Sequence, residues 1–202
     1  MKQTRKKRNT RTFGRTFGKN DFSSGDGMVT KIWGPIMWTA LHTISFNYPV
    51  NPTLDDKKHY KDFIYKLKYV LPCKYCRINL TKNLKQKPLL NCHMKNRETF
   101  SRYIYELHEL VNKMLDKKST LSYCDVRERY EHFRSRCTEE KPRIFNFIKS
   151  QTKKKKYNKK ENEKGCTEPL YGKKSKCIIN IVPQEDKNAT FQIDKKCIKT
   201  RE

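Results

Sequence analysis

The chain has 202 residues, and its 47 lysines and arginines against 21 aspartates and glutamates give a formal net charge of +26. This length suits one domain with tails, and a hydrophobic share of only 35% argues against two packed cores. No run of 18 apolar residues is present, which excludes a membrane span, and the basic N-terminus lacks the apolar segment of a secretory signal. We therefore expect a cytoplasmic protein that is not secreted.

Composition divides the chain into three parts. Residues 1–30 are basic, rich in Thr, Gly and Ser, and too poor in apolar side chains to build a core, so we expect a disordered arm. Residues 31–140 contain the regular apolar periodicity and are predicted to form the folded domain. Residues 141–202 contain lysine runs and one short strand-like segment, 177–182, and are predicted to form an irregular basic tail. Basic tails of this kind favour contact with an anionic partner such as a nucleic acid.

Five stretches of the central segment have apolar residues every three to four positions, the pattern of amphipathic helices. Prolines at positions 49, 72 and 88 close three of these stretches, because proline and the residue before it disfavour a continuing helix. Thr53, Asn96 and Ser122 are suitable capping residues where three of the stretches begin. The sequence therefore predicts an all-α fold, a small bundle of four helices plus a short fifth. The predicted helices cover residues 33–48, 54–71, 73–87, 97–115 and 123–133.

A pair of cysteines, Cys73 and Cys76, stands at the predicted start of the third helix. Two cysteines with this spacing form either a dithiol redox centre or half of a zinc site. A zinc site needs a second ligand pair, but Cys92 is followed directly by His93, and position 95 is a lysine, so the ligand count is poor. The positive end of the helix and the basic neighbours predict a lowered pKa for both thiols, which favours redox chemistry.

Three blocks of the central segment match a known family. They are Trp38-Thr39-Ala40-Leu41-His42 with Tyr48-Pro49, then Cys73-Lys74-Tyr75-Cys76, then Leu107-His108-x-x-Val111-Asn112-x-x-Leu115. In this order and spacing, over about residues 31–137, they resemble the flavin-linked sulfhydryl oxidases of the Erv/ALR type. A thioredoxin-like domain would instead need flanking strands that the sequence lacks.

The resemblance implies a bundle that holds FAD, usually as a homodimer. It implies oxidation of dithiols, in protein substrates or in a thioredoxin-like partner, with molecular oxygen as acceptor and hydrogen peroxide as product. Cys73 is then expected to meet the substrate and Cys76 the flavin, with no metal ion. The lysine- and asparagine-rich sequence resembles the branch of large DNA viruses, which implies the host cytoplasm and the virion. By position, the cofactor contacts fall on Trp38, His42, Tyr48, His108, Asn112, Leu115, Lys117, Tyr123 and Tyr130.

The chain departs from the family pattern in its other cysteines. Many members join the fourth helix to a cysteine in the following loop, but the helix position here is Tyr105, which leaves Cys124 without that partner. The resemblance makes Cys137 the substitute, so a structural Cys124–Cys137 disulfide is expected. Family members also relay electrons through tail cysteines, and Cys166 and Cys177 are candidates for such a shuttle. Free or locally bridged thiols are an equally good interpretation of these two.

The alternative function is that of a basic nucleic-acid-binding or virion structural protein whose cysteines are incidental. It predicts a colourless protein with salt-dependent nucleic-acid binding, whereas a flavoprotein oxidase is yellow. The visible absorbance spectrum of the purified protein distinguishes the two.

Overall fold

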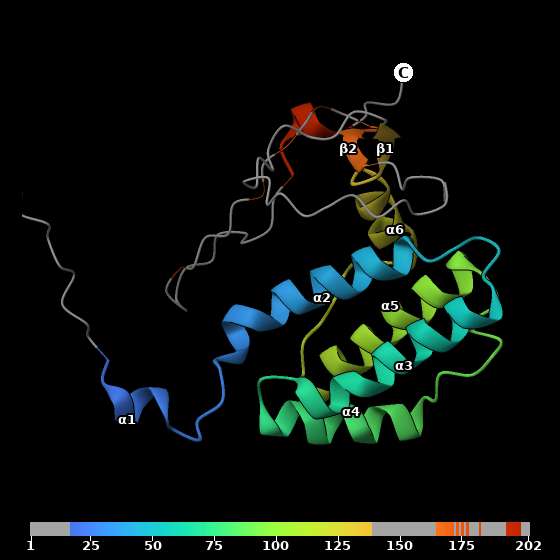
Figure 1. The fold of residues 1–202 in the computed structure, drawn as a ribbon. Helices are drawn as coiled ribbons and strands as arrows, with labels where there is room; N and C mark the ends of the chain where they lie inside the picture. The colour runs from blue at the N-terminus through green and yellow to red at the C-terminus, as the bar shows by residue number, and fades with distance from the viewer. Residues whose placement is uncertain are drawn as a thin grey trace, which may run out of the picture.

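The structure, a computed structural model, describes residues 17–138, 165–171 and 193–198, together with residues 173, 175, 177 and 182. In this part of the chain it contains six α-helices, two short strands and one 3-10 helix, so the predicted helical class is confirmed (Figure 1). The elements are α1 (Lys19–Phe22), α2 (Thr30–Phe46), α3 (Leu54–Val70), α4 (Lys74–Gln86), α5 (Arg97–Met114), α6 (Tyr123–Glu131), β1 (Ser135–Thr138), β2 (Gly165–Pro169) and η1 (Lys195–Cys197).

The helices begin where the capping residues predict. At the start of α3 the Thr53 hydroxyl accepts a hydrogen bond from the backbone N–H of Asp56, and the Asp56 carboxylate accepts one from the backbone N–H of Thr53. Ser122 and Asp125 make the same reciprocal pair at the start of α6. Each pair satisfies backbone donors that the first helical turn leaves open. These ends are therefore fixed by local sequence.

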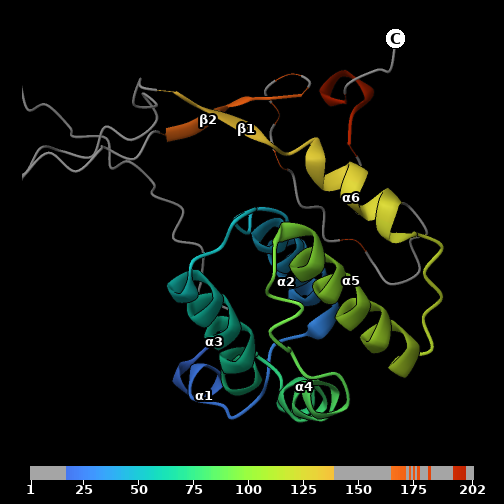
Figure 2. The ribbon, with the colours of Figure 1, turned by 90° about the vertical axis from the view of Figure 1, so that its right-hand side faces the viewer.

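Helices α2 to α5 form the bundle. Helix α2 packs against α5 and α3 packs against α4, while α6 crosses one end of the bundle and contacts both α2 and α5 (Figure 1, Figure 2). The facing side chains form a core of leucine, isoleucine and aromatic residues, in which Phe100 and Ile104 are completely buried. A smaller second cluster, built around Phe46, Tyr123 and Tyr130, lies between α2 and α6. Burial of these faces holds α2, α5 and α6 in fixed relative positions.

The expectation of a wholly irregular arm over residues 1–30 is wrong for the end of that arm. The backbone N–H of Gly18 donates to the Asp21 carboxylate and closes the short helix α1. Further on, the backbone N–H of Met28 donates to the Pro72 carbonyl oxygen at 2.9 Å. Caps and backbone hydrogen bonds of this kind do not require regularly spaced apolar residues, so the apolar pattern of the sequence does not reveal them. The first sixteen residues of the arm lie outside the described part of the chain.

The C-terminal tail contributes one strand, β2, which pairs antiparallel with β1 at the end of the central segment. Residues of β1 face residues of β2, from Ser135 opposite Pro169 to Thr138 opposite Gly165. The strand predicted at 177–182 lies outside the described residues except for its two ends, which have no regular structure. Among the described helices, none combines the length and the apolar character needed to cross a bilayer.

Candidate active site

The cysteine pair lies at the N-terminal end of α4. Cys73 is the residue that caps the helix, and its sulfur accepts a hydrogen bond from the backbone N–H of Cys76 at 3.3 Å. Both residues are free thiols and both are partly buried. A sulfur in this position meets the positive end of the helix, where an anion is stabilised. The fold therefore gives the pair the electrostatic setting that its spacing predicts.

The two thiols differ in their tendency to ionise. A hydrogen bond from the Cys76 thiol stabilises the charged form of Cys73 and lowers its pKa, with help from the backbone N–H groups of Cys76 and Tyr75. Burial raises the pKa of Cys76, which packs against the main core. The expectation of two lowered pKa values is thus confirmed for Cys73 and wrong for Cys76. The thiolate forms first on Cys73.

A short segment that leads into the first residue of α2, residues 27–30, runs beside the cysteine pair, and we call it the N-terminal strap. The hydrogen bond from Met28 to Pro72 ties the strap to the residue directly before Cys73. At Gly27 a Cβ atom would lie 3.0 Å from the Pro72 carbonyl oxygen, closer than real contacts of this kind normally are. Glycine is therefore the residue that permits this approach.

The last residue of the strap reaches the dithiol itself. The Oγ1 atom of Thr30 lies 3.8 Å from the Sγ atom of Cys76, within hydrogen-bond distance for sulfur. Thr30 is also the first residue of α2, so this contact joins the start of α2 to α4. The sequence did not indicate it, because the two residues are 46 positions apart.

Four of the predicted cofactor residues form one aromatic cluster where α2, α5 and α6 meet. The rings of Trp38 and His108 stack with centroids 4.0 Å apart and an angle of 7° between their planes. The Nε2 atom of His42 lies 3.1 Å from the Nδ1 atom of His108. The ring of Tyr130 lies 5.3 Å from that of His42. Flat, partly polar rings of this type make suitable walls for a fused heterocycle.

Both histidines of this cluster are held neutral. Burial, followed by the neighbouring His108, lowers the pKa of His42 to about 3, and burial, followed by Lys117, lowers the pKa of His108 to about 4. Between two neutral rings, one of the facing nitrogens donates and the other accepts. The Nδ1 atom of His42 is buried and finds no hydrogen-bond partner among the described residues. A polar group bound in the cluster would satisfy it.

Three further predicted residues lie at or beyond the C-terminal end of α5, which also carries His108. Lys117 is close enough to His108 to lower the pKa of that ring, and its backbone N–H donates to the Asn112 carbonyl oxygen at 2.9 Å. Asn112, one helical turn beyond His108, donates through its side-chain amide to Glu109. Leu115 caps the helix and is half exposed. Lys117 thus lies beside the cluster, and Asn112 and Leu115 follow His108 towards the same end of α5.

The remaining two predicted residues differ in their surroundings. Tyr123 joins the cluster through Phe46, with ring centroids 6.2 Å apart, and its hydroxyl lies 2.8 Å from that of Ser101. Tyr48 lies in the main core instead, where it is completely buried. Its hydroxyl donates to the Met94 carbonyl oxygen at 3.0 Å.

Phe46 belongs to the cluster although the sequence patterns did not single it out. Its ring stacks on Tyr130 with centroids 5.3 Å apart and lies 6.4 Å from the ring of His42. It follows His42 by one helical turn, as His42 follows Trp38. The spacing of four residues was the signal that could have revealed it.

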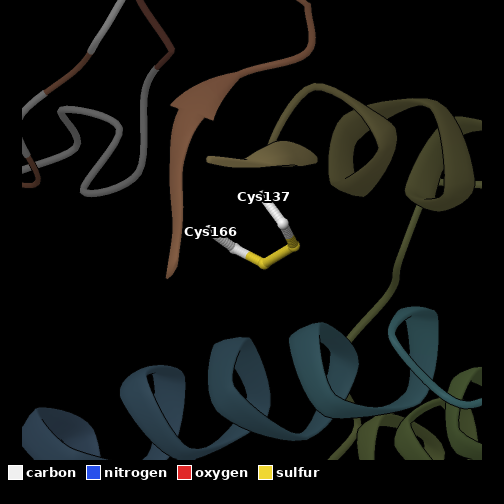
Figure 3. The surroundings of a disulfide bond; sticks show 2 residues. All are labelled: Cys137 and Cys166. Carbon is white, nitrogen blue, oxygen red and sulfur yellow. A yellow bond between two sulfur atoms is a disulfide. The ribbon is translucent and has the colours of Figure 1, made fainter. Parts of the chain in front are cut away.

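The disulfide differs from the expected one. Cys137 in β1 is bonded to Cys166 in β2, with Cα atoms 3.9 Å apart (Figure 3). Cys124 is a free, exposed thiol near the start of α6, so the expected Cys124–Cys137 bond is wrong. A helix rises by about 1.5 Å per residue, so the part of α6 that follows Cys124 is by itself longer than the roughly 7 Å that a disulfide spans. Strand pairing instead brings Cys166 opposite Cys137.

The other candidate shuttle residue, Cys177, is exposed and free, so it is not bonded to Cys166 in this structure. No three His, Cys, Asp or Glu side chains of the described residues converge as metal ligands would.

Comparison with known proteins gives consistent matches. The model of the Erv1/Alr family matches residues 35–131. A probable FAD-linked sulfhydryl oxidase of Acanthamoeba polyphaga mimivirus is 37% identical over 52% of this chain and 72% of its own length. An FAD-linked sulfhydryl oxidase of African swine fever virus is 31% identical over 49% of this chain and 80% of its own length.

Cellular proteins match over a smaller share of their length. The mitochondrial FAD-linked sulfhydryl oxidase Erv1 of Saccharomyces cerevisiae is 31% identical over 42% of this chain and 43% of its own length. The crystal structure of the yeast Erv1 core is 26% identical, with a TM-score of 0.48, and the alignment covers 60% of this chain and 95% of that one.

Proposed function

Because this chain belongs to the Erv1/Alr family, we propose that it is an FAD-dependent thiol oxidase. It oxidises dithiols of protein substrates to disulfides, with molecular oxygen as the final acceptor and hydrogen peroxide as the product. The observation that carries the proposal is that α2 joins a dithiol to an aromatic cluster. Thr30 at its start contacts Cys76, while Trp38 and His42 in its middle form the cluster with His108.

The aromatic cluster fits a flavin. Trp38 and His108 offer parallel ring faces, and the unpartnered Nδ1 of His42 offers a hydrogen bond to a polar ring atom. Lys117 provides positive charge beside His108, which suits an anionic cofactor. FAD would supply the transfer of the electron pair from the dithiol to oxygen. The proposed cofactor residues are Trp38, His42, Tyr48, His108, Asn112, Leu115, Lys117, Tyr123 and Tyr130. Of these, Tyr48 is completely buried in the main core.

The cysteine pair exchanges disulfides with the substrate. When the pair is oxidised, a substrate thiolate attacks the Cys73 sulfur, a mixed disulfide forms, and Cys76 leaves with the electron pair of the broken bond. The second substrate thiolate then attacks the substrate sulfur of the mixed disulfide, which releases the oxidised substrate and leaves Cys73 as a thiolate. The lowered pKa of Cys73 makes it a good leaving group. Cys76, the more buried thiol, passes the electrons inward.

The experiment compares Cys76→Ser with Cys124→Ser, which removes an exposed thiol outside the site. Oxygen consumption and peroxide production are measured with dithiothreitol, and the visible spectrum reports bound FAD. Cys76→Ser should lose dithiol oxidation and keep the yellow cofactor, while Cys124→Ser should keep both. A protein that stays colourless with FAD, or a fully active Cys76→Ser enzyme, would contradict the proposal.

We also propose a homodimer. Ile32 and Ile36 lie one turn apart on α2 and are 45% and 44% exposed, an apolar stripe on the helix that carries part of the site. Light scattering should give two chains per particle for the wild type and one for Ile36→Lys. Ile78→Lys, at an equally exposed isoleucine of α4, should leave the dimer intact.

A relay through the tail remains part of the proposal. Since Cys166 is bonded to Cys137, a substrate dithiol would first exchange with this bond, and the reduced pair would then exchange with Cys73 and Cys76. Cys177 can serve as an additional thiol. Truncation at about residue 141 should slow turnover of a protein dithiol and leave turnover of dithiothreitol unchanged. Equal slowing of both substrates would count against a relay.

We propose the host cytoplasm and the virion as the setting of this activity, since two of the similar sulfhydryl oxidases are viral proteins. Neither these matches nor the described residues support the alternative of a nucleic-acid-binding structural protein.

A further inference from the structure

The chain around the dithiol is uniformly basic. Between Asp62 in α3 and Glu98 in α5 there are nine lysines and arginines and no aspartate or glutamate. Among the described residues, Lys87 alone of these nine forms an ion pair, with Glu106. Asp26, just before the N-terminal strap, is the one acidic residue between α1 and α3. The positive charge beside the dithiol is therefore not neutralised by the described part of the chain.

Basic and apolar side chains lie on the segments that adjoin the cysteine pair along the chain and through the strap. The end of α3 leads directly into the turn before Cys73, the start of α4 follows it, and the Met28–Pro72 hydrogen bond adds the strap. We call this surface the dithiol rim. It consists of Met28, Lys66, Lys68, Tyr69, Lys74 and Tyr75.

The rim has the character of a protein-contact surface. Its apolar members are mostly open to solvent, with Tyr75 75%, Met28 68% and Tyr69 65% exposed. The ammonium groups of Lys66 and Lys68 lie 6.0 and 4.9 Å from the centroid of the Tyr69 ring, so charge and aromatic surface are held together. Exposed apolar groups that are bordered by charge mark interaction sites.

We propose that the dithiol rim binds an acidic polypeptide segment that carries the substrate cysteines. This inference rests on the proposed oxidase function, because Lys74 and Tyr75 of the rim stand between the two cysteines that the proposed function uses. Opposite charge speeds the encounter and fixes the orientation of the substrate. A single-stranded nucleic acid also suits lysines and tyrosines, but it brings no thiol to Cys73.

The test uses the full-length protein loaded with FAD and two synthetic dithiol peptides that share one Cys-x-x-Cys core. One peptide has Glu and Asp on both sides of the core, and the other has Gln and Asn. At low ionic strength kcat/KM should be about tenfold higher for the acidic peptide, in the range of modest electrostatic steering. Added salt should bring the ratio towards one, because it screens exposed charges.

Two triple variants locate the effect. Lys66→Gln/Lys68→Gln/Lys74→Gln should abolish the preference for the acidic peptide. The matched control is Lys57→Gln/Lys58→Gln/Lys61→Gln, which removes the same charge from the other half of α3. This control should retain the preference for the acidic peptide. The readout is the ratio of kcat/KM for the acidic peptide to kcat/KM for the neutral peptide. A change in thiol reactivity affects both values equally and cancels in this ratio.

Three results would overturn the proposal. They are equal rates for the two peptides, a preference that persists in the rim variant, and inhibition by a single-stranded oligonucleotide without peptide discrimination. Turnover of dithiothreitol distinguishes failure of the proposed oxidase function from failure of the rim proposal. If the wild type does not oxidise dithiothreitol, the proposed function fails. If it oxidises dithiothreitol but does not distinguish the peptides, only the rim proposal fails.

Discussion

The Nε2 atom of His42 and the Nδ1 atom of His108 lie 3.1 Å apart, inside a cluster that also contains Trp38 and Tyr130. Burial keeps both imidazoles uncharged, with pKa values of about 3 and 4. A neutral pair can share one hydrogen bond, whereas two charged rings at this distance would repel one another. The cluster therefore depends on neutral histidines.

This pair predicts a loss of stability in mild acid. Unfolded histidine titrates near pH 6.5, so below that pH the unfolded state binds protons that the folded state does not. Stability is complete above pH 6.5 and is lost as the pH falls towards the folded pKa values. The free energy of unfolding of the FAD-free protein should approach a decrease of about 1.4 kcal/mol per pH unit for each histidine. Urea titrations between pH 7 and pH 4.5 measure it.

Two variants serve as controls for this pH dependence. His108→Gln should reduce the slope by the share of one histidine, about 1.4 kcal/mol per pH unit. His59→Gln, at an exposed position of α3, should leave the slope unchanged. An unchanged slope in His108→Gln would show that other groups cause the acid sensitivity.

Thr30 is predicted to tune the dithiol. Its hydroxyl lies at hydrogen-bond distance from Cys76 and lowers the pKa of both cysteines. Thr30→Val, which keeps the shape and removes the hydroxyl, should raise both pKa values and slow alkylation by iodoacetamide at neutral pH. Thr30→Ser should behave like the wild type, and so should Thr43→Val, at an exposed position of α2. Equal alkylation profiles for Val and Ser at position 30 would refute this role.

Gly27 is predicted to be required for the approach of the strap. A Cβ atom there would lie 3.0 Å from a backbone oxygen, so Gly27→Ala must shift the strap away from Pro72. We expect a loss of about 1 kcal/mol of stability, typical of a single substitution, and faster hydrogen exchange at the Met28 amide. Gly25→Ala is the control, since a Cβ atom at Gly25 would have no neighbour within 4 Å. Similar exchange rates in the two variants would contradict the prediction.

The Cys137–Cys166 disulfide is predicted to hold β1 and β2 together. A bond that closes a loop of 29 residues contributes roughly 3–4 kcal/mol by restricting the open chain, and an isolated two-stranded ladder is marginal without it. Cys137→Ser should therefore expose the amides of residues 165–169 to rapid hydrogen exchange. Peptide mapping without reduction should find this cross-link and an alkylated Cys124. A linked Cys124 peptide would disprove the pairing.

The sequence alone predicted the five helices α2 to α6 and proposed the reactive pair. Caps such as Thr53 with Asp56, and Ser122 with Asp125, act within one helical turn, so the local sequence determines where these helices begin. The spacing of Cys73 and Cys76 likewise places both at one helix end.

The tertiary structure decided what depends on residues that are distant along the chain. Strand pairing gave Cys137 its partner in Cys166, and the strap brought Thr30 to Cys76. The raised pKa of Cys76 and the buried position of Tyr48 follow from packing against the core, which the local sequence does not encode. The sequence thus predicted which residues react. The packing of distant segments decided their ionisation, their partners and the surface around them.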